Sequence, residues 1–288
     1  MKAPFRKLAL AIAFSPRIRA LLAETARLKL LWNAELCIIH VGEKTDEEEK
    51  VLQEHLKVVG LADVSDVRIF WEYGKPSEKI LARCKKENVD LLIAGALRKE
   101  KLIQYYLGTV ARKILRKADC SVLMLTDPKI APLPFQNIVV NAENSNYIQE
   151  ALRTAISICQ QDEAQWLHVA RELKLYGLTM SASENYSEVE YENVRHSLVK
   201  DEITSVQNIL DRIPHEGVKI NIKLLSGKSG FELAKFAQRK NADLLVVGAS
   251  PRRFSIFDRV FPNDLEYIFA DLPTNLLVVH PRKEGLNG

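Results

Sequence analysis

The chain has 288 residues, of which 47% are hydrophobic and 27% charged, with a formal net charge of +4. This composition is typical of a globular protein. Glycine and proline are too few for a chain built of glycine-rich or proline-rich repeats. Basic and acidic residues are interleaved and no apolar run reaches the length of a membrane span, so we expect no nucleic-acid partner, no membrane and a cytoplasmic location.

Four cysteines stand far apart, at Cys37, Cys84, Cys120 and Cys159. None forms a C-x2-C pair or has a nearby histidine, so no metal site is expected. We expect buried thiols in a reducing compartment, with a disulfide as the less favoured alternative. The basic, apolar start resembles a signal peptide, but the similar run Ile138–Val140 in mid-chain argues that it is a strand instead.

In the first half, apolar runs alternate with helical spacing. Strands are expected at 7–14, 36–41, 67–73, 91–94 and 121–125, and helices at 16–32, 46–59, 77–86 and from 109 onward. Ser15 is the expected N-cap of the first helix, with Pro16 at its first position. Such alternation predicts an α/β fold with a mainly parallel sheet covered on both faces.

The same plan returns in the second half. Gly74-Lys75 and Gly227-Lys228 lie 153 residues apart, and so do Asn88-Val89-Asp90 and Asn241-Ala242-Asp243. A constant register indicates a duplicated unit. We therefore expect one domain at 1–127, a proline-containing linker at 128–135, and a second domain at 136–283.

The second unit carries an addition at about 173–214, between strands expected at 165–169 and 218–225. Residues 188–213 have helical spacing, so we predict a long helix preceded by a segment rich in serine, tyrosine and glutamate. Two readings of this addition stay open: a cap over the second pocket, or a plain structural extension.

The stretch 90–109 has the features of an anion site. A buried strand ends at Gly95, a basic loop containing Arg98 follows, and Gly108-Thr109 opens a helix. Glycines allow close backbone approach to a phosphate, and the free amides at a helix start supply hydrogen bonds and positive charge.

This spacing resembles the G-x2-G-x9-G-S/T nucleotide loop of the universal stress protein family, with Arg98 in place of the second glycine. The resemblance covers nearly all of both halves except the addition. It implies two tandem open parallel five-stranded sheets of strand order 3-2-1-4-5, Rossmann-type and similar to the nucleotide-binding adenine alpha-hydrolases. It also implies that the last strands, Val122–Leu125 and Leu276–Val279, pair the halves into a pseudo-dimer, with a further homodimer as an option.

By the same resemblance, the first unit would bind ATP or a related adenine nucleotide, with Mg2+ as a companion. The carried-over residues are Val41, Gly95, Arg98, Gly108 and Thr109. The family usually has an acidic residue, in a D-x-S arrangement, at the end of the first strand. Ala13 stands there in this chain, so the first unit lacks that carboxylate.

The second unit shows the opposite pattern. Glu143 falls at the acidic position, and with Val169 and Gly248 it defines a possible second site. Pro251 and Phe261-Pro262 replace the later loop glycines, and proline offers no amide to a phosphate. We therefore expect a degenerate site, and we favour solvent-facing roles for Arg252 and Arg253 over anion binding.

Two further motifs could be interpreted as catalytic or ligand-binding. His40-Val41 and His168-Val169 are expected at the same place in both units, and we favour scaffold histidines because no relay partner is placed beside them. Gly227-Lys228-Ser229 contains part of a P-loop, but the earlier glycine is replaced by Ile222. A turn into a helix is the better interpretation.

The sequence thus predicts a stress-response protein that binds an adenine nucleotide in its first domain. No catalytic residue is assigned and catalysis is not required. The alternative is a regulatory or interaction module of the same fold that binds no nucleotide and meets unidentified protein partners. A slow nucleotide hydrolase comes third, because no general base is visible.

Overall fold

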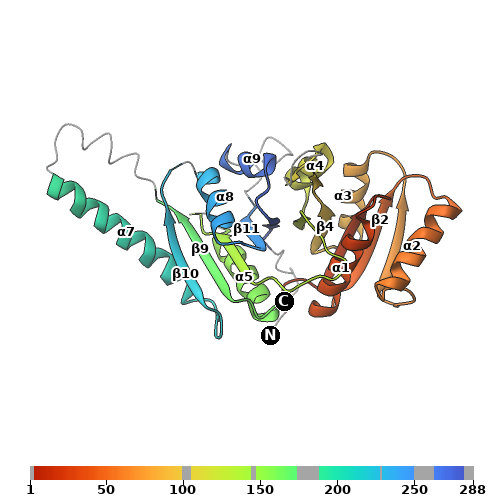
Figure 1. The fold of residues 1–288 in the computed structure, drawn as a ribbon, viewed down its shortest axis with the longest axis horizontal. Coiled ribbons are helices and arrows are strands. Elements are labelled where there is room, and N and C mark those ends of the chain that lie inside the picture. Colours follow the sequence, from red (N-terminus) through yellow and green to blue (C-terminus); the bar gives the residue numbers. More distant parts are fainter. Residues whose placement is uncertain are drawn as a thin grey trace.

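The computed structural model describes residues 3–98, 105–143, 147–173, 188–227, 229–249 and 263–281. It is an α/β protein made of two similar halves, repeat 1 and repeat 2 (Figure 1). The elements of repeat 1 are β1 (Lys7–Ile12), α1 (Ile18–Trp32), β2 (Glu35–Val41), α2 (Asp46–Val58), β3 (Val67–Glu72), α3 (Pro76–Lys86), β4 (Leu91–Gly95), β5 (Leu97–Arg98), β6 (Tyr105–Tyr106), α4 (Thr109–Lys117) and β7 (Ser121–Leu125).

Repeat 2 contains β8 (Asn137–Asn141), α5 (Ile148–Gln161), β9 (Trp166–Glu172), α7 (Glu188–Leu210), β10 (Ile220–Leu225), α8 (Ser229–Arg239), β11 (Leu244–Gly248), α9 (Asn263–Ala270) and β12 (Asn275–Val279). Within each repeat the five long strands are parallel and follow the order 3-2-1-4-5. The predicted strand order is therefore confirmed in both halves.

The two sheets are joined edge to edge into one ten-stranded sheet, with the order β10-β9-β8-β11-β12-β7-β4-β1-β2-β3. The join is the antiparallel pair β12–β7, in which Leu277 faces Leu123. This pairing of the last strands confirms the pseudo-dimer that was expected within one chain. We call the β7–β12 pair and the contacts beside it the seam.

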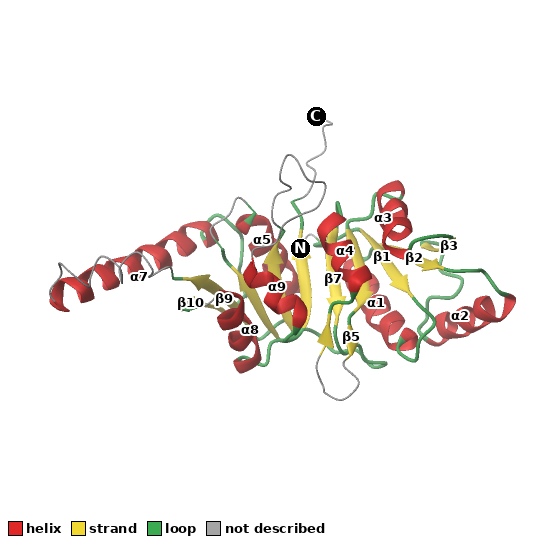
Figure 2. Ribbon diagram, turned by 90° about the horizontal axis from the view of Figure 1, so that it is seen from above, coloured by secondary structure: helices red, strands yellow, loops and turns green. Residues whose placement is uncertain are grey.

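Hydrophobic clusters cover both faces of the sheet. One cluster, on what we call the α1 face, takes residues from α1, α2, α5 and α7; the other, on the α4 face, takes residues from α3, α4, α8 and α9. Side chains alternate along each strand, so Leu8 and Leu10 point to the α1 face and Ala9 to the α4 face. Figures 1 and 2 show the two halves side by side, each with helices packed on its strands, and Figure 2 shows β7 near the middle of the sheet.

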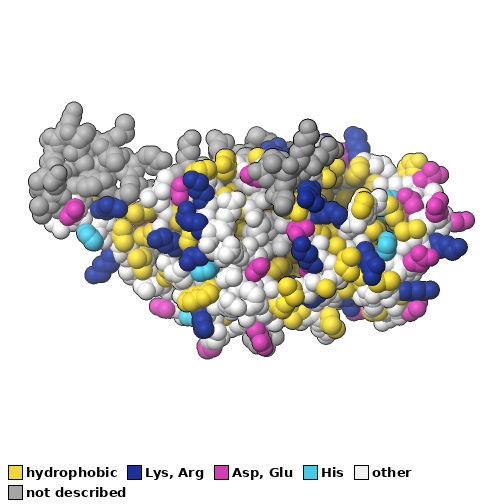
Figure 3. All heavy atoms as spheres, viewed as in Figure 1, with side chains coloured by type: hydrophobic (Ala, Val, Ile, Leu, Met, Phe, Trp, Pro, Cys, Tyr) yellow, Lys and Arg dark blue, Asp and Glu magenta, His cyan; other side chains and the backbone are white. Residues whose placement is uncertain are grey.

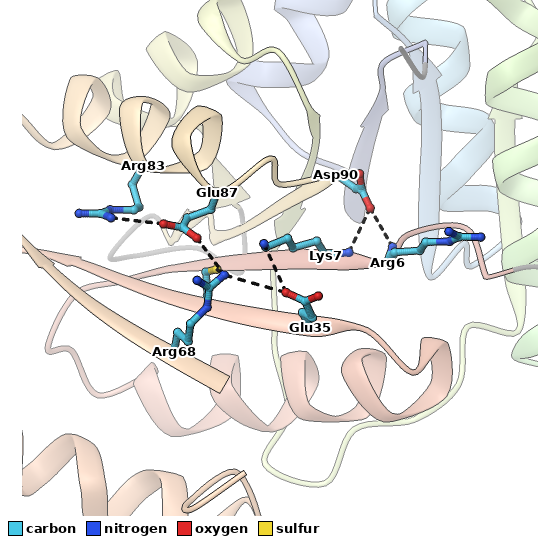
Figure 4. A network of polar contacts seen from close by, with 8 residues as sticks. Arg6, Lys7, Glu35, Arg68, Arg83, Glu87 and Asp90 are labelled. Carbon is cyan, nitrogen blue, oxygen red and sulfur yellow. Dashed lines mark hydrogen bonds and ion pairs between the residues drawn. The ribbon is translucent and has the colours of Figure 1, made fainter. Parts of the chain in front are cut away.

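The repeated Asn-x-Asp sequence has a structural reason. In each repeat the aspartate carboxylate clamps the start of the first strand: Oδ2 of Asp90 accepts from the N–H groups of Arg6 (2.9 Å) and Lys7 (3.0 Å), and Oδ2 of Asp243 accepts from those of Gln136 (2.8 Å) and Asn137 (2.8 Å). Figure 4 shows the Asp90 clamp beside the ion pairs of β2, β3 and α3. The preceding asparagines, Asn88 and Asn241, have φ of 52° and 46°, a region that asparagine tolerates better than most residues.

The first helix begins later than predicted. Strand β1 ends at Ile12 and not at residue 14, and Arg17 occupies the N-cap of α1 in place of Ser15. Ser15 instead accepts the N–H of Ile18 through its carbonyl oxygen, at 3.0 Å. This turn ahead of the helix, with the Arg17 side chain held by backbone carbonyls described below, explains the shift.

The addition in repeat 2 is largely an extension of an element that both repeats share. Helix α7 has 23 residues against 13 in α2, and its Val206 and Leu210 enter the same α1-face cluster as Leu52 and Leu56 of α2. Figure 1 shows α7 reaching well beyond the edge of β10. The last turns of α7 pack on the α1 face through Val206 and Leu210, which supports a structural extension; residues 174–187 lie outside the described residues.

The turns predicted ahead of the third helix of each unit are present. Gly74 and Gly227 have φ of 120° and 128° and introduce α3 and α8, so the partial P-loop motif is a turn, as predicted. All four cysteines are free and buried. Among the described residues, no helix combines the length and apolarity needed to cross a membrane. On the face drawn in Figure 3, Lys and Arg side chains are interspersed with acidic and hydrophobic ones.

Candidate functional site

The strand order of each repeat reverses beside its first strand. In repeat 1, β1 lies between β2 and β4, and in repeat 2, β8 lies between β9 and β11. Ligands of open parallel sheets bind beyond the carboxyl ends of the strands at such a switch point. The candidate site of repeat 1 therefore lies at the ends of β1, β2 and β4.

On the α4 face, the strand ends at this site carry small apolar side chains. Ala11 and Val41 pack against the α4-face cluster, and the alternation of the strand continues to Ala13, which is exposed. No carboxylate stands at these three positions. At these three positions the α4 face of the sheet carries apolar side chains.

The basic loop predicted between Gly95 and Gly108 is a β-hairpin. Strands β5 and β6 pair antiparallel, with Leu97 opposite Tyr106 and Arg98 opposite Tyr105. Residues 99–104 lie outside the described residues. The hairpin returns the chain so that a Cβ added at Gly108 would lie 2.6 Å from Cδ1 of Leu97. The long spacing between the glycines is therefore used to bring Gly108 back to the end of β4.

Gly95 and Gly108 leave room for neighbouring leucine side chains that a Cβ would crowd. Gly108 has φ of −69° and ψ of 173°, an ordinary extended conformation, so its lack of a side chain matters only because Leu97 is close. A Cβ on Gly95 would lie 3.2 Å from Cδ1 of Leu21. Gly95 thus allows α1 to pack closely against β4, while its backbone forms the edge of the site.

Gly108 is also the N-cap of α4, and no side chain caps this helix start. The first-turn amides and the helix dipole therefore favour an anion there. Thr109 is exposed at the first position of the helix, and Arg98 is exposed on the hairpin. The described site contributes amides, a hydroxyl and a guanidinium, which suits a phosphate.

Repeat 2 holds the returning strand of the hairpin. The N–H of Leu107 donates to the carbonyl oxygen of Phe269 at 3.0 Å, and the N–H of Leu272 donates to that of Tyr105 at 2.8 Å. Tyr105 and Leu272 also form an isolated antiparallel bridge. The residues just before Gly108 are therefore fixed by the other half of the molecule.

Arg17 holds the opposite side of the hairpin base, and the sequence did not indicate it. Its Nη1 donates to the carbonyl oxygen of Ala96 at 2.7 Å and its Nη2 donates to that of Thr126. The guanidinium carbon lies 5.6 Å from the ring centroid of Tyr105. A cation at a helix start interacts unfavourably with the helix dipole. The position of Arg17 at the start of a predicted helix is therefore the sequence signal that could have pointed to a role for its side chain.

A small polar cluster continues from Tyr105 into the linker. Burial, followed by a hydrogen bond to Asp127, raises the pKa of Tyr105. The hydrogen bond from Lys129, with further contributions from Tyr105 and Arg17, holds the pKa of Asp127 below its usual value. The backbone N–H of Lys129 donates to Oε1 of Glu24 at 3.2 Å, so the start of the linker is tied to α1.

His40 lies on the other face from the site. Its ring makes edge contacts with Phe14 and Trp71, at centroid distances of 4.9 Å and 5.0 Å. Its Nδ1 lies 3.4 Å from the carbonyl oxygen of Ile12. A Cβ on Gly42 would come within 2.4 Å of its Nε2, so the ring fills the available space. These contacts support the scaffold interpretation.

The expected match between His40-Val41 and His168-Val169 is wrong by three residues. Leu8 pairs with Leu36 as Ile138 pairs with Leu167, which aligns Val41 with Glu172. Strand β9 runs to Glu172, beyond the end expected at Val169. Val169 is fully buried in the α1-face cluster and His168 corresponds to Cys37, so neither lies at the strand end.

Arg171 takes the place of His40 in repeat 2. Its Nη1 donates to the carbonyl oxygen of Ala142 at 2.6 Å, just as His40 approaches the equivalent carbonyl of Ile12. Its Nε pairs with Oε2 of Glu202 on α7 at 2.8 Å. The extended helix thus supplies a carboxylate for a buried cation.

The remaining predicted residues of repeat 2 are only partly described. The strand registers make Glu143 the residue of repeat 2 that is equivalent to Ala13 of repeat 1, and continue to place it beside Glu172. A Cβ on Gly248 would have only an ordinary 3.5 Å contact with Tyr147. Pro251, Arg252, Arg253, Phe261 and Pro262 lie outside the described residues.

Comparison with known proteins shows the family. The model of the universal stress protein family matches this chain twice, at residues 42–126 and 134–280, and the two matches include most of the sequence. The chain belongs to the universal stress protein family, as a tandem of two units.

Among individual relatives, universal stress protein MJ0531 of Methanocaldococcus jannaschii is 26% identical over 159 residues, which are 52% of this chain and 85% of that protein. A universal stress protein from Archaeoglobus fulgidus DSM 4304 has a similar structure, with a TM-score of 0.66, 15% identity and coverage of 95% and 98% of the two chains. The cytoplasmic domain of a prokaryotic cation chloride cotransporter is also similar in fold, with a TM-score of 0.53, 13% identity and coverage of 96% and 95%.

Proposed function

We propose that repeat 1 binds ATP or a related adenine nucleotide, with Gly95, Gly108 and Thr109 at its phosphates and Val41 at its base. The observation that carries this proposal is the hairpin β5–β6, which returns Gly108 and the uncapped start of α4 to the end of β4. Amides at a helix start and a switch point in the strand order are features that phosphate groups exploit.

The residues present fit such a ligand. The apolar floor of Ala11, Ala13 and Val41 suits an aromatic base, and the exposed guanidinium of Arg98 suits the phosphates. Among the described residues no group of three His, Cys, Asp or Glu side chains is placed to hold a metal. Any Mg2+ that accompanies the nucleotide would therefore be held mainly by phosphate oxygens and water.

The test is thermal unfolding with and without millimolar MgATP, because a ligand that binds only the folded state raises Tm. Gly108→Val would fill the space beside Leu97 and the helix start, and is expected to abolish the shift. Thr204→Val, on an exposed position of α7 away from both sites, is the control and should retain the shift. An unchanged Tm of the wild-type protein would refute the proposal.

A second candidate is a regulatory or interaction module that binds no nucleotide. It is favoured by Arg98 in place of a glycine and by the missing carboxylate at Ala13. Mass spectrometry of the small molecules released from natively purified protein separates the two, because this candidate predicts no bound nucleotide.

Slow hydrolysis is a third candidate. Phosphate release by wild-type protein, compared with Thr109→Ala, tests whether the hydroxyl at the start of α4 assists a reaction. Equal background rates in both proteins would leave binding as the function.

The location, the domain boundaries and the state of the second site are also proposals. We infer a cytoplasmic protein with domains at 1–127 and 136–283, a linker at 128–135, and a degenerate second site around Glu143 and Gly248. Light scattering over a range of concentrations tests whether a further homodimer forms, and subcellular fractionation tests the location.

A further inference from the structure

Two of the four cysteines lie together. Cys84 is in the last turn of α3 and Cys120 immediately precedes β7, and a hydrogen bond joins their side chains. Both belong to the α4-face cluster. Backbone hydrogen bonds explain the approach: the N–H of Val89 donates to the carbonyl of Cys84 at 2.9 Å, and the N–H of Ser121 donates to that of Asp90 at 3.0 Å.

The last turn of α3 is held firmly, so the thiol of Cys84 has a fixed position. Arg83 pairs with Glu87 at 3.3 Å and with Glu72 at 2.6 Å, and Glu87 also pairs with Arg68 of β3 at 2.8 Å. Figure 4 shows the Arg83–Glu87 and Arg68–Glu87 pairs, with the Asp90 clamp next to them. Ion pairs on both sides of Cys84 therefore tie α3 to the edge of the sheet.

The pair borders a cavity. Cys84 and Cys120 line a cavity of about 680 Å³ at the amino ends of β4 and β7, next to the seam. Glu150 of α5 and His280 after β12 line the same cavity, so both repeats contribute to it. Cys120 is 9% exposed and Cys84 is 4% exposed. Both thiols are buried, and a small oxidant that enters this cavity would meet Cys120, the more exposed of the two, first.

The hydrogen bond to Cys120, followed by burial, raises the pKa of the Cys84 thiol. Cys120 is the more exposed of the two thiols, which favours it for the first attack and leaves Cys84 as the resolving thiol.

We propose that Cys84 and Cys120 form a reversible disulfide when the protein meets hydrogen peroxide. The Cys120 thiolate attacks one peroxide oxygen, an S–O bond forms, the O–O bond breaks, and the leaving hydroxide takes up a proton. The Cys84 sulfur then attacks the Cys120 sulfur, the S–O bond breaks, and water leaves with the thiol proton. Two thiols lose two electrons, and one peroxide becomes two waters.

The other cysteines serve as controls within the same chain. Cys37 lies in the same cluster, but its Sγ accepts from Nη2 of Arg68 at 3.8 Å. Cys159 lies in the opposite cluster, on the α1 face, and burial raises its pKa to about 12. Neither is expected to oxidise before the Cys84–Cys120 pair.

The test uses the full-length reduced protein treated with hydrogen peroxide, then alkylated in denaturant and weighed. Four alkylated thiols are expected before oxidation and two after it, and the oxidised protein is expected to be lighter by about 2 Da before alkylation. Proteolysis without reduction should yield a peptide that joins Cys84 to Cys120, and a dithiol reductant should restore four thiols. Four alkylated thiols after peroxide, or a different cysteine pair, would overturn the proposal.

Variants assign the two roles. Cys84→Ser should leave a sulfenic acid on Cys120 that dimedone traps, whereas Cys120→Ser should give no dimedone adduct on Cys84. Cys37→Ser and Cys159→Ser should retain the disulfide. Because buried substitutions can impair folding, the wild-type mass measurement stands independently, and a dimedone adduct on Cys84 in wild-type protein would reverse the proposed order.

Discussion

The side-chain carbonyl of Asn275 accepts two hydrogen bonds from Thr126 across the seam, one from its backbone N–H at 2.9 Å and one from its hydroxyl at 3.1 Å. The amide nitrogen of Asn275 donates in turn to the carbonyl oxygen of Asp243 at 2.9 Å. One residue of repeat 2 therefore fixes the end of β7, next to the contacts that Arg17 makes in repeat 1.

Replacing Asn275 should weaken the seam. Asn275→Ala leaves the Thr126 donors without their acceptor, and we expect the free energy of unfolding to fall by about 1–3 kcal/mol. Urea unfolding measures the loss. Asn208→Ala, on an exposed position of α7, is the control and should change stability by less than about 0.5 kcal/mol. Equal effects of the two substitutions would contradict the role of Asn275.

The two strand clamps should behave alike. Asp90→Ala and Asp243→Ala each remove a carboxylate that accepts two backbone N–H groups, and each is expected to cost about 1–3 kcal/mol. Asp90→Asn and Asp243→Asn keep an acceptor oxygen and should recover part of the loss. Chemical denaturation of all four variants gives the comparison. A large cost in one repeat and none in the other would mean that the clamp is not equivalent in the two units.

Arg17 should influence both the hairpin and the ionisation of Tyr105. Its charge lowers the pKa of Tyr105, so Arg17→Met should raise that pKa further, and near-ultraviolet titration of tyrosine can measure the change. The carbonyls of Ala96 and Thr126 also lose their donor, so stability should fall. Arg19→Met, on an exposed position of the same helix, is the matched control and should leave the tyrosine titration unchanged.

The lowered pKa of Asp127 predicts that the folded protein loses stability in acid. Its folded-state pKa is lowered from 3.8, first by the hydrogen bond from Lys129, so its contribution is fully present above the unfolded-state value. That contribution disappears as the pH falls through the folded-state pKa. Asp127→Asn should therefore flatten the acid limb of a plot of urea midpoint against pH. An identical acid limb in the variant would exclude Asp127 as a source of this dependence.

The organisation of the fold was readable from the sequence. The apolar runs and the constant spacing of Gly74 with Gly227 predicted the strands and the duplication, because these features are local and recur in register. The order of strands and their pairing at the seam came from the family resemblance. The end of β1 and the start of α1 were misplaced, because the Arg17 side chain is held by carbonyls more than 70 residues away, at Ala96 and Thr126.

The site was less accessible to sequence reasoning. The glycine positions were found, but their packing against Leu21 and Leu97 needed coordinates. The error at Val169 arose because a His-Val pair recurs in both second strands, while only the hydrogen-bonded register reveals that β9 continues to Glu172. The hold of repeat 2 on Tyr105 and Leu107 is a contact between distant backbone groups and has no pattern in the chain.

The antiparallel joining of β7 to β12 has a consequence for how the assembly responds to dilution. Two separate subunits that pair through such strands come apart as their concentration falls. Here a short connection keeps the two halves at an effective concentration of the order of millimolar, whatever the amount of protein. The two halves should therefore stay together at low abundance.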